Sequence, residues 1–207
     1  MKRKDEILAA AAHVFAQHGF RGSTTRLIAD TAGVNEITLF RQFGSKEELI
    51  RQAMHHCSQF VGFTPLPDVA VDPERELTAW SESFISYLRL QSSMIRKTMS
   101  EIEERPEMSE MASSVPRQAS ADLCEYLTAL KRQGFITEKF DARTAAAMLM
   151  GSIFADAVGR GMMPDVYPPA DKAAHMYTQL LLRALGVENR SRKTTHKQSK
   201  RSKQLSA

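Results

Sequence analysis

Three adjacent residues, His55, His56 and Cys57, form the one compact group of metal-ligating side chains in this 207-residue sequence. Successive residues of a helix point about 100° apart, so these three side chains cannot all face one ion. The remaining histidines show no ligand spacing: His13, His18, His175 and His196. The sequence therefore predicts no metal site.

Patterns for catalysis are equally sparse. The sequence contains no glycine-rich phosphate loop and no nucleophile elbow. Cys57 and Cys124 form no CxxC pair, which excludes a disulfide framework and favours a reducing cytosol. One group of acidic residues is interpreted as a solvated helix face: Glu101, Glu103, Glu104, Glu107 and Glu110. We therefore predict a cytoplasmic protein that is not an enzyme and needs no cofactor.

The strongest chemical pattern is the segment Thr24 to Phe43, which has the layout of a helix-turn-helix. Two short helices flank a tight turn at Gly33, and apolar residues supply the face between them: Ile28, Ala29, Val34 and Leu39. The opposite face of the second helix is polar. In such units the second helix enters the DNA major groove by its N-terminal part. An ordinary helical hairpin shares this spacing and is the alternative.

The segments that must position these residues are predicted to be helices, and the alternation of apolar and polar residues that is typical of strands is nearly absent. Ser45 and Glu48 fit a reciprocal capping box, whereas Pro116 is expected to kink or interrupt a helix. No apolar run approaches the roughly 20 residues that cross a bilayer, so no membrane contact is predicted. The pattern predicts about nine helices, including 4–18, 25–31, 36–43, 46–61, 73–91, 119–133, 142–158 and 170–185.

The formal net charge of +4 belongs to the C-terminal end of the chain. Residues 1–50 carry a net charge of +1, residues 51–186 carry −3, and residues 187–207 carry +6. The last segment has almost no apolar content, so burial cannot offset its ordering entropy, and we predict a disordered basic tail. Its alternatives are a solvated tail without a role and a non-specific phosphate-binding arm.

Residues 7 to 50 resemble the DNA-binding domain of the TetR family of transcriptional regulators. The resemblance covers about a fifth of the chain and implies a homodimeric repressor. It implies an all-α fold with a three-helix DNA-binding domain (1–50), a six-helix ligand-binding and dimerisation domain (51–186) and the tail (187–207). The matching residues are Ile7-Leu8, Ala11, Phe15, His18-Gly19-Phe20, Thr24-Thr25, Ile28-Ala29, Ala32-Gly33-Val34, Thr38-Leu39-Phe40, Phe43 and Ser45-Lys46-Glu47-Glu48-Leu49.

The resemblance also implies which residues hold the DNA backbone. Thr25 and Lys46 stand at helix starts where the family holds phosphates, and backbone N–H groups at helix N-termini favour anions. Thr38 and Arg41 are expected to touch phosphates, which sets the register on DNA rather than the sequence read. The family usually has Tyr at the position of Phe40, so this chain keeps the packing and loses a hydroxyl contact to phosphate.

Base reading is expected from the groove-facing surface and from Arg26, whose guanidinium suits guanine. That surface comprises Asn35, Glu36, Ile37 and Gln42, of which Gln42 suits adenine and Glu36 suits cytosine. The family usually has a small residue or Pro at the position of Ile37. A branched side chain there either blocks close approach or contacts a thymine methyl group. Glu36 in the groove is costly unless it finds a hydrogen-bond donor.

The helical body is expected to hold a ligand pocket. Eight of the eleven methionines lie between Met94 and Met163, and flexible methionines accommodate varied apolar partners. An apolar or aromatic effector is therefore favoured. The pocket residues we expect are Trp80, Phe84, Tyr87, Tyr126, Met148 and Phe154. The alternative is that they are simply core.

The same body is expected to form the dimer. The helix over 142–158 is apolar nearly all round, and with the last helix it would form half of a four-helix interface across a two-fold axis. The interface residues we expect are Met150, Tyr177, Leu181 and Leu185. The alternative is a helix buried within one subunit.

Together these observations predict a sequence-specific DNA-binding repressor, nucleoid-associated, that a small apolar or aromatic ligand releases from a palindromic operator. Two other classes remain as alternatives. A non-specific architectural protein would bind nucleic acid through its tail and ignore sequence. A small helical enzyme has no catalytic constellation in its support.

Overall fold

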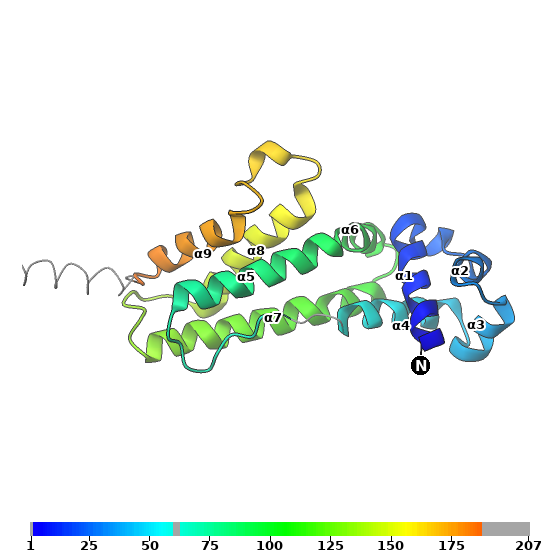
Figure 1. Ribbon diagram of the computed structural model, residues 1–207, viewed down its shortest axis with the longest axis horizontal. Helices are drawn as coiled ribbons and strands as arrows, with labels where there is room; N and C mark the ends of the chain where they lie inside the picture. The colour runs from blue at the N-terminus through cyan, green and yellow to red at the C-terminus, as the bar shows by residue number, and fades with distance from the viewer. Residues whose placement is uncertain (1, 60–62, 188–207) are drawn as a thin grey trace, which may run out of the picture.

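The computed structural model describes residues 2–59 and 63–187, and these residues fold almost entirely into helices (Figure 1). One end of the elongated molecule, the head, consists of α1–α3 and the first part of α4; the body consists of α5–α9. The helices are α1 (Lys2–Gly22), α2 (Thr25–Ala32), α3 (Glu36–Phe43), α4 (Lys46–Gln59), α5 (Pro73–Leu90), α6 (Ser92–Glu101), α7 (Glu107–Arg132), α8 (Ala142–Gly159) and α9 (Ala173–Ala184), with a 3₁₀ turn at Pro164–Val166.

The head has its own apolar core, built where α1 packs against α2 and α4. Ile7, Phe15, Ile28 and Leu39 are all almost fully buried there. The cluster continues along α4 to Met54 and receives Met108 from α7. The domain boundary predicted at residue 50 therefore lies inside α4, which belongs to the head at one end and reaches the body at the other.

Local capping explains why the short helices form where the sequence predicts them. The Thr24 hydroxyl accepts a hydrogen bond from the Leu27 N–H (3.1 Å), and the Asn35 side chain accepts one from the Ile37 N–H (2.9 Å). Gly33 ends α2 in the left-handed region at φ 63°, which favours glycine. The predicted helix over 36–43 is confirmed, and α2 extends one residue beyond its prediction.

Two predicted breaks appear in a weaker form or not at all. The first helix was expected to stop at Gly19, where α1 does leave helical geometry (φ 68°), but a further short turn continues to Gly22. Pro116 was expected to kink or interrupt a helix, and α7 is not interrupted there. Pro116 and Ala112 are both exposed, so water can solvate the Ala112 carbonyl that loses its backbone donor.

The capping box is only half formed. Ser45 accepts from the Glu48 N–H (3.1 Å), as predicted. The Glu48 carboxylate does not return to Ser45, because it accepts hydrogen bonds from Arg51 and Gln52 instead. The Ser45 N–H donates to the Phe43 carbonyl (2.9 Å), so it remains satisfied without the carboxylate.

The body is organised around α8, which packs against α5, α7 and α9. Its core encloses a charge: the side chain of Asp156 is fully buried. Asp156 accepts hydrogen bonds from Arg89 (3.1 Å), the Arg160 Nε (2.8 Å) and the Tyr177 hydroxyl (3.0 Å). Burial alone would raise the pKa of Asp156, but these hydrogen bonds outweigh it and hold that pKa below its ordinary value.

Candidate DNA-binding surface and ligand pockets

The outer face of α3 is exposed and carries both polar and apolar side chains. Ile37 is 74% exposed and Phe40 is 50% exposed, unusual values for large apolar residues on a short helix. Of the ten predicted DNA contacts, six are exposed: Arg26, Asn35, Ile37, Phe40, Arg41 and Gln42. The other four are half-buried: Thr25, Glu36, Thr38 and Lys46. The surface is therefore accessible, although some members are already engaged within the head.

Two of the predicted contacts are joined to each other. The Thr25 hydroxyl donates a short hydrogen bond to the Glu36 carboxylate, which links the first residue of α2 to the first residue of α3. This contact supplies the donor that a glutamate at this position needs. Asn35 is likewise engaged, because its side-chain oxygen caps α3. The bond between Thr25 and Glu36 therefore links α2 to α3, whereas Asn35 caps its own helix.

Lys46 lies against an aromatic ring rather than extending freely into solvent. Its ammonium lies 4.3 Å from the ring centroid of Phe20, and the Arg105 guanidinium lies 3.6 Å from the same centroid. Desolvation lowers the pKa of Lys46; Arg105 lowers it further, and Glu47 opposes the shift. Phe20 therefore joins the start of α4 to the segment that follows α6.

The same joint contains a partly buried hydrogen bond to the backbone. At the Gly19 kink the N–H of Phe20 leaves the helix ladder and donates to the Glu101 carboxylate of α6 (2.7 Å). A Cβ built on Gly19 would lie 2.2 Å from that carboxylate oxygen, and the φ of 68° lies in the region that favours glycine. The interpretation of the acidic group as a solvated face is wrong for Glu101. The two partners are 81 residues apart, and no local sequence signal marks the pair.

An apolar cavity of about 350 Å³ lies where α4, α5, α6, α7 and α8 meet. Three predicted pocket residues line it, Phe84, Tyr87 and Phe154. Met150, predicted for the dimer interface, also lines it. Sequence reasoning missed the contribution of α6, which no aromatic residue marks. Its residues there are Met94, Ile95, Thr98 and Met99, with Gln91 at the bend before it.

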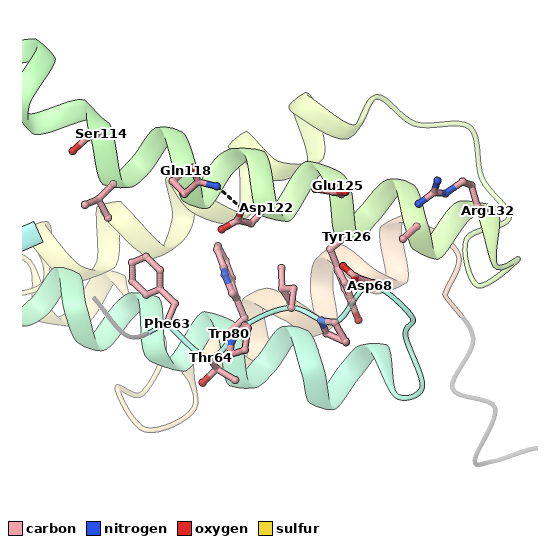
Figure 2. A pocket seen from close by; sticks show the side chains of 15 residues that line it. Phe63, Thr64, Asp68, Trp80, Ser114, Gln118, Asp122, Glu125, Tyr126 and Arg132 are labelled. Atoms are coloured by element: carbon pink, nitrogen blue, oxygen red, sulfur yellow. Dashed lines mark hydrogen bonds between the residues drawn. The ribbon is translucent and has the colours of Figure 1, made fainter. Parts of the chain in front are cut away.

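The other predicted pocket residues lie elsewhere. Trp80 and Tyr126 line a second cavity of about 700 Å³ between α5, α7 and the loop that begins at Phe63 (Figure 2). Met148 lies 63% exposed in an apolar groove between α8 and α9. The six predicted residues therefore line three separate hollows rather than one pocket.

Three of the four predicted dimer residues line the apolar groove between α8 and α9: Tyr177, Leu181 and Leu185. Within the subunit Leu181 and Leu185 are largely buried, and Tyr177 donates its hydroxyl hydrogen to Asp156. The outward face of α8 and α9 carries further apolar side chains. Met148 lies there with Met176 and Leu180, and Leu180 is 71% exposed. Small residues of α8 complete the exposed stripe: Ala147, Gly151 and Ala155.

None of the helices within the described residues has the length and apolar character needed to traverse a bilayer. Within 2–59 and 63–187, no three histidine, cysteine, aspartate or glutamate residues gather as a metal site would require.

Comparison with known proteins identifies the N-terminal segment. Residues 7–53 match the family model "Bacterial regulatory proteins, tetR family", and this segment contains the helix-turn-helix just described. The head is therefore a TetR-family DNA-binding domain. The prediction made from residues 7 to 50 is confirmed, and the family's members are transcriptional regulators rather than enzymes.

The relatives with the higher sequence identity match only part of the chain, whereas a relative that matches most of the chain has a lower identity. The HTH-type transcriptional repressor KstR2 of Mycolicibacterium smegmatis is 35% identical over 78 residues, 37% of this chain and only 38% of that repressor. YvkB of Bacillus subtilis, an uncharacterized HTH-type transcriptional regulator, is 24% identical over 88% of this chain and 96% of its own. The higher identity therefore covers only part of the chain, and the chain spans less than two fifths of that repressor's length in this match.

The complete fold also has solved counterparts. A TetR-family regulator structure from Mesorhizobium loti superposes with a TM-score of 0.71 and covers 89% of this chain and 95% of its own. Its sequence identity to this chain is 19%, so the likeness concerns the fold. The predicted all-α architecture with an N-terminal helix-turn-helix is confirmed.

Proposed function

We propose that this chain is a transcriptional repressor that binds a palindromic operator as a homodimer and is released by a small apolar ligand. The exposed face of α3 carries the proposal. Ile37 and Phe40 are large apolar side chains left in water beside Arg41 and Gln42. Contact with base edges and thymine methyl groups would bury the two apolar groups and give the polar ones partners.

The dimer is proposed through the outward face of α8 and α9. Met148, Met176 and Leu180 are exposed there, next to an apolar groove. A two-fold axis would place each apolar row against its copy, since an isologous interface uses one patch twice. Two heads separated by about 34–36 Å would then meet successive major grooves on one side of the DNA.

Ligand release is proposed to start in the cavity of about 350 Å³. Its walls are almost entirely apolar, and Gln91, Tyr87 and Thr98 supply the polar groups. One helix, α6, lines this cavity and also carries Glu101, which holds the Phe20 N–H of the head. A ligand that binds the cavity better when α6 is displaced would shift the heads away from the operator spacing.

DNA selection from a random pool tests the central claim, followed by anisotropy titration of the selected duplex and of a scrambled duplex. A sequence preference that survives at physiological salt is expected. A protein that binds both duplexes equally would refute the proposal and favour the non-specific architectural alternative.

Three arginine variants refine that titration. Arg26→Ala is expected to cost about 1–3 kcal/mol on the selected duplex and to relax preference at one position. Arg41→Ala is expected to weaken both duplexes alike, because a phosphate contact carries no sequence information. Arg143→Ala is the matched control, since Arg143 is an exposed arginine on α8 in the body. Equal losses for all three variants would contradict the assigned roles.

A further inference from the structure

The cavity of about 700 Å³ is chemically unlike the apolar cavity of the proposed repressor mechanism. Its size falls in the range of small-molecule sites. Aromatic side chains form part of its wall, Phe63, Trp80 and Tyr126, whereas Asp68, Asp122 and Glu125 bring carboxylates to the same space. Figure 2 shows these side chains converging between α5, α7 and the loop that runs from Phe63 to Asp68.

The charges in this cavity are unbalanced. Three carboxylates face one guanidinium, that of Arg132, which lies at the far end of the row beyond Tyr126 (Figure 2). Asp122 accepts a hydrogen bond from the Gln118 amide (2.7 Å), a neutral donor that leaves its charge uncompensated. Within the described residues, Asp68 and Glu125 have no ion-pair partner. A cationic ligand would therefore gain favourable electrostatic energy there.

A second and independent feature concerns Trp80. Its side chain is only 1% exposed, and the indole projects from α5 toward Asp122 of α7 (Figure 2). Among the residues that the structure describes, the indole N–H donates to no acceptor, and it is not one of the fully enclosed polar atoms, so it is open to the cavity. One face of the ring stacks on Phe84 (centroids 5.2 Å apart), which fixes its orientation. A ligand oxygen would supply the missing acceptor.

We infer that this cavity binds a small organic cation that also carries an oxygen acceptor. The carboxylates of Asp122 and Glu125 attract the cationic group, and the Trp80 indole N–H donates to the acceptor. The site adjoins the apolar cavity, since Val115 lines both. Phe63, which lines the larger cavity, packs edge-on against Phe84 and Tyr87, which line the apolar one (centroids 5.3 and 5.5 Å).

Trp80 is the only tryptophan of the chain, so its fluorescence reports occupancy of this cavity directly. The probe is butyrylcholine, which carries a quaternary cation and an ester carbonyl. Its neutral isostere is 3,3-dimethylbutyl butanoate, and heptyltrimethylammonium keeps the cation without the ester. Titrations are run on the full chain without DNA, so their outcome is independent of operator binding.

The cation is expected to bind about tenfold tighter than the neutral ester, and raising salt from about 50 to about 500 mM should weaken it. Heptyltrimethylammonium should bind about fivefold more weakly than butyrylcholine, because it leaves the indole N–H without an acceptor. Equal affinity for butyrylcholine and the neutral ester would overturn the inference.

A pair of double variants gives the decisive comparison. Asp122→Asn with Glu125→Gln is expected to weaken butyrylcholine about tenfold. Glu82→Gln with Asp171→Asn removes the same charge from exposed positions that do not line the cavity, and should leave the affinity unchanged. Far-ultraviolet circular dichroism checks that both remain folded. Equal effects of the two double variants would refute the site.

Discussion

The head and the body bury different kinds of side chain. Among the described residues, Ser23 is the one fully buried polar residue of the head, whereas the body buries Ser81, Thr98, Asp156 and Thr178. The cavities of about 700 and about 350 Å³ lie mainly in the body. The head therefore presents its chemistry on its outer surface and uses its interior for stability. The body keeps polar groups and space inside, where a ligand can reach them.

The largest effect that would sharpen this contrast is expected at Asp156. Asp156→Asn removes the charge that Arg89 and Arg160 share, and breaking a buried pair of this kind should cost about 3 kcal/mol of unfolding free energy. Denaturant titration followed by Trp80 fluorescence measures the loss. Asp171→Asn, an exposed aspartate beyond α8, is the control and should change little. Equal stability of the two variants would contradict the importance of this buried network.

The pH dependence of the same variant has a defined sign. The folded-state pKa of Asp156 lies below its ordinary value of about 4, so its contribution to stability is full above that value. The contribution is lost as the pH falls through the lowered pKa. The wild-type chain should therefore lose more stability than Asp156→Asn on acidification in this range. An identical acid response would contradict the sign.

The connection between the two regions is the next place to test. Glu101→Ala removes the acceptor of the Phe20 N–H and should cost about 1.5 kcal/mol, since a carboxylate makes a strong hydrogen bond. Hydrogen exchange of the Phe20 amide should accelerate about tenfold. Glu103→Ala changes an exposed neighbour and should leave that amide unaffected. Protection retained in Glu101→Ala would show that the contact does not hold the joint.

Local structure in the head could be predicted from the sequence, whereas the arrangement of the pocket residues in the body could not. The helix over 36–43 was predicted correctly, because Asn35 and Gly33 act through bonds to residues a few positions away. Trp80 and Phe84 stack on one face of α5 and were placed in one pocket. In the folded chain they line different cavities: Trp80 lines the larger one together with Phe63, and Phe84 lines the apolar one. Phe63 comes from a loop distant in sequence and packs edge-on against Phe84.

Glu101 is a second residue whose role depends on a long-range contact that the local sequence does not indicate. Its sequence neighbours are acidic and mostly exposed, so a solvated face is the local expectation. Only the kink at Gly19, which exposes a backbone N–H to another helix, gives this one glutamate a partner. Contacts between the two regions depend on such long-range encounters and cannot be derived from local spacing.

The basic C-terminal segment tests whether sequence preference belongs to the head alone. Residues 188–207 lie outside the described residues, and they carry seven Lys or Arg against one Glu. A chain that ends at Val187 should bind the selected duplex about fivefold more weakly, with a shallower salt dependence, because fewer counterions are released. The preference over a scrambled duplex should persist. Loss of that preference would move specificity away from the head.

The smallest expected effect is a gain at the surface of α3. Phe40 is half exposed beside the polar residues of the predicted DNA face, and the family usually has Tyr at this position. Phe40→Tyr adds a hydroxyl that can donate to a phosphate while the ring keeps its packing, so affinity should rise about twofold, about 0.5 kcal/mol. Phe63→Tyr adds the same hydroxyl in the body and should leave DNA affinity unchanged. The gain should appear on selected and scrambled duplexes alike, because phosphates are common to both. A gain confined to the selected duplex would instead place residue 40 against the bases.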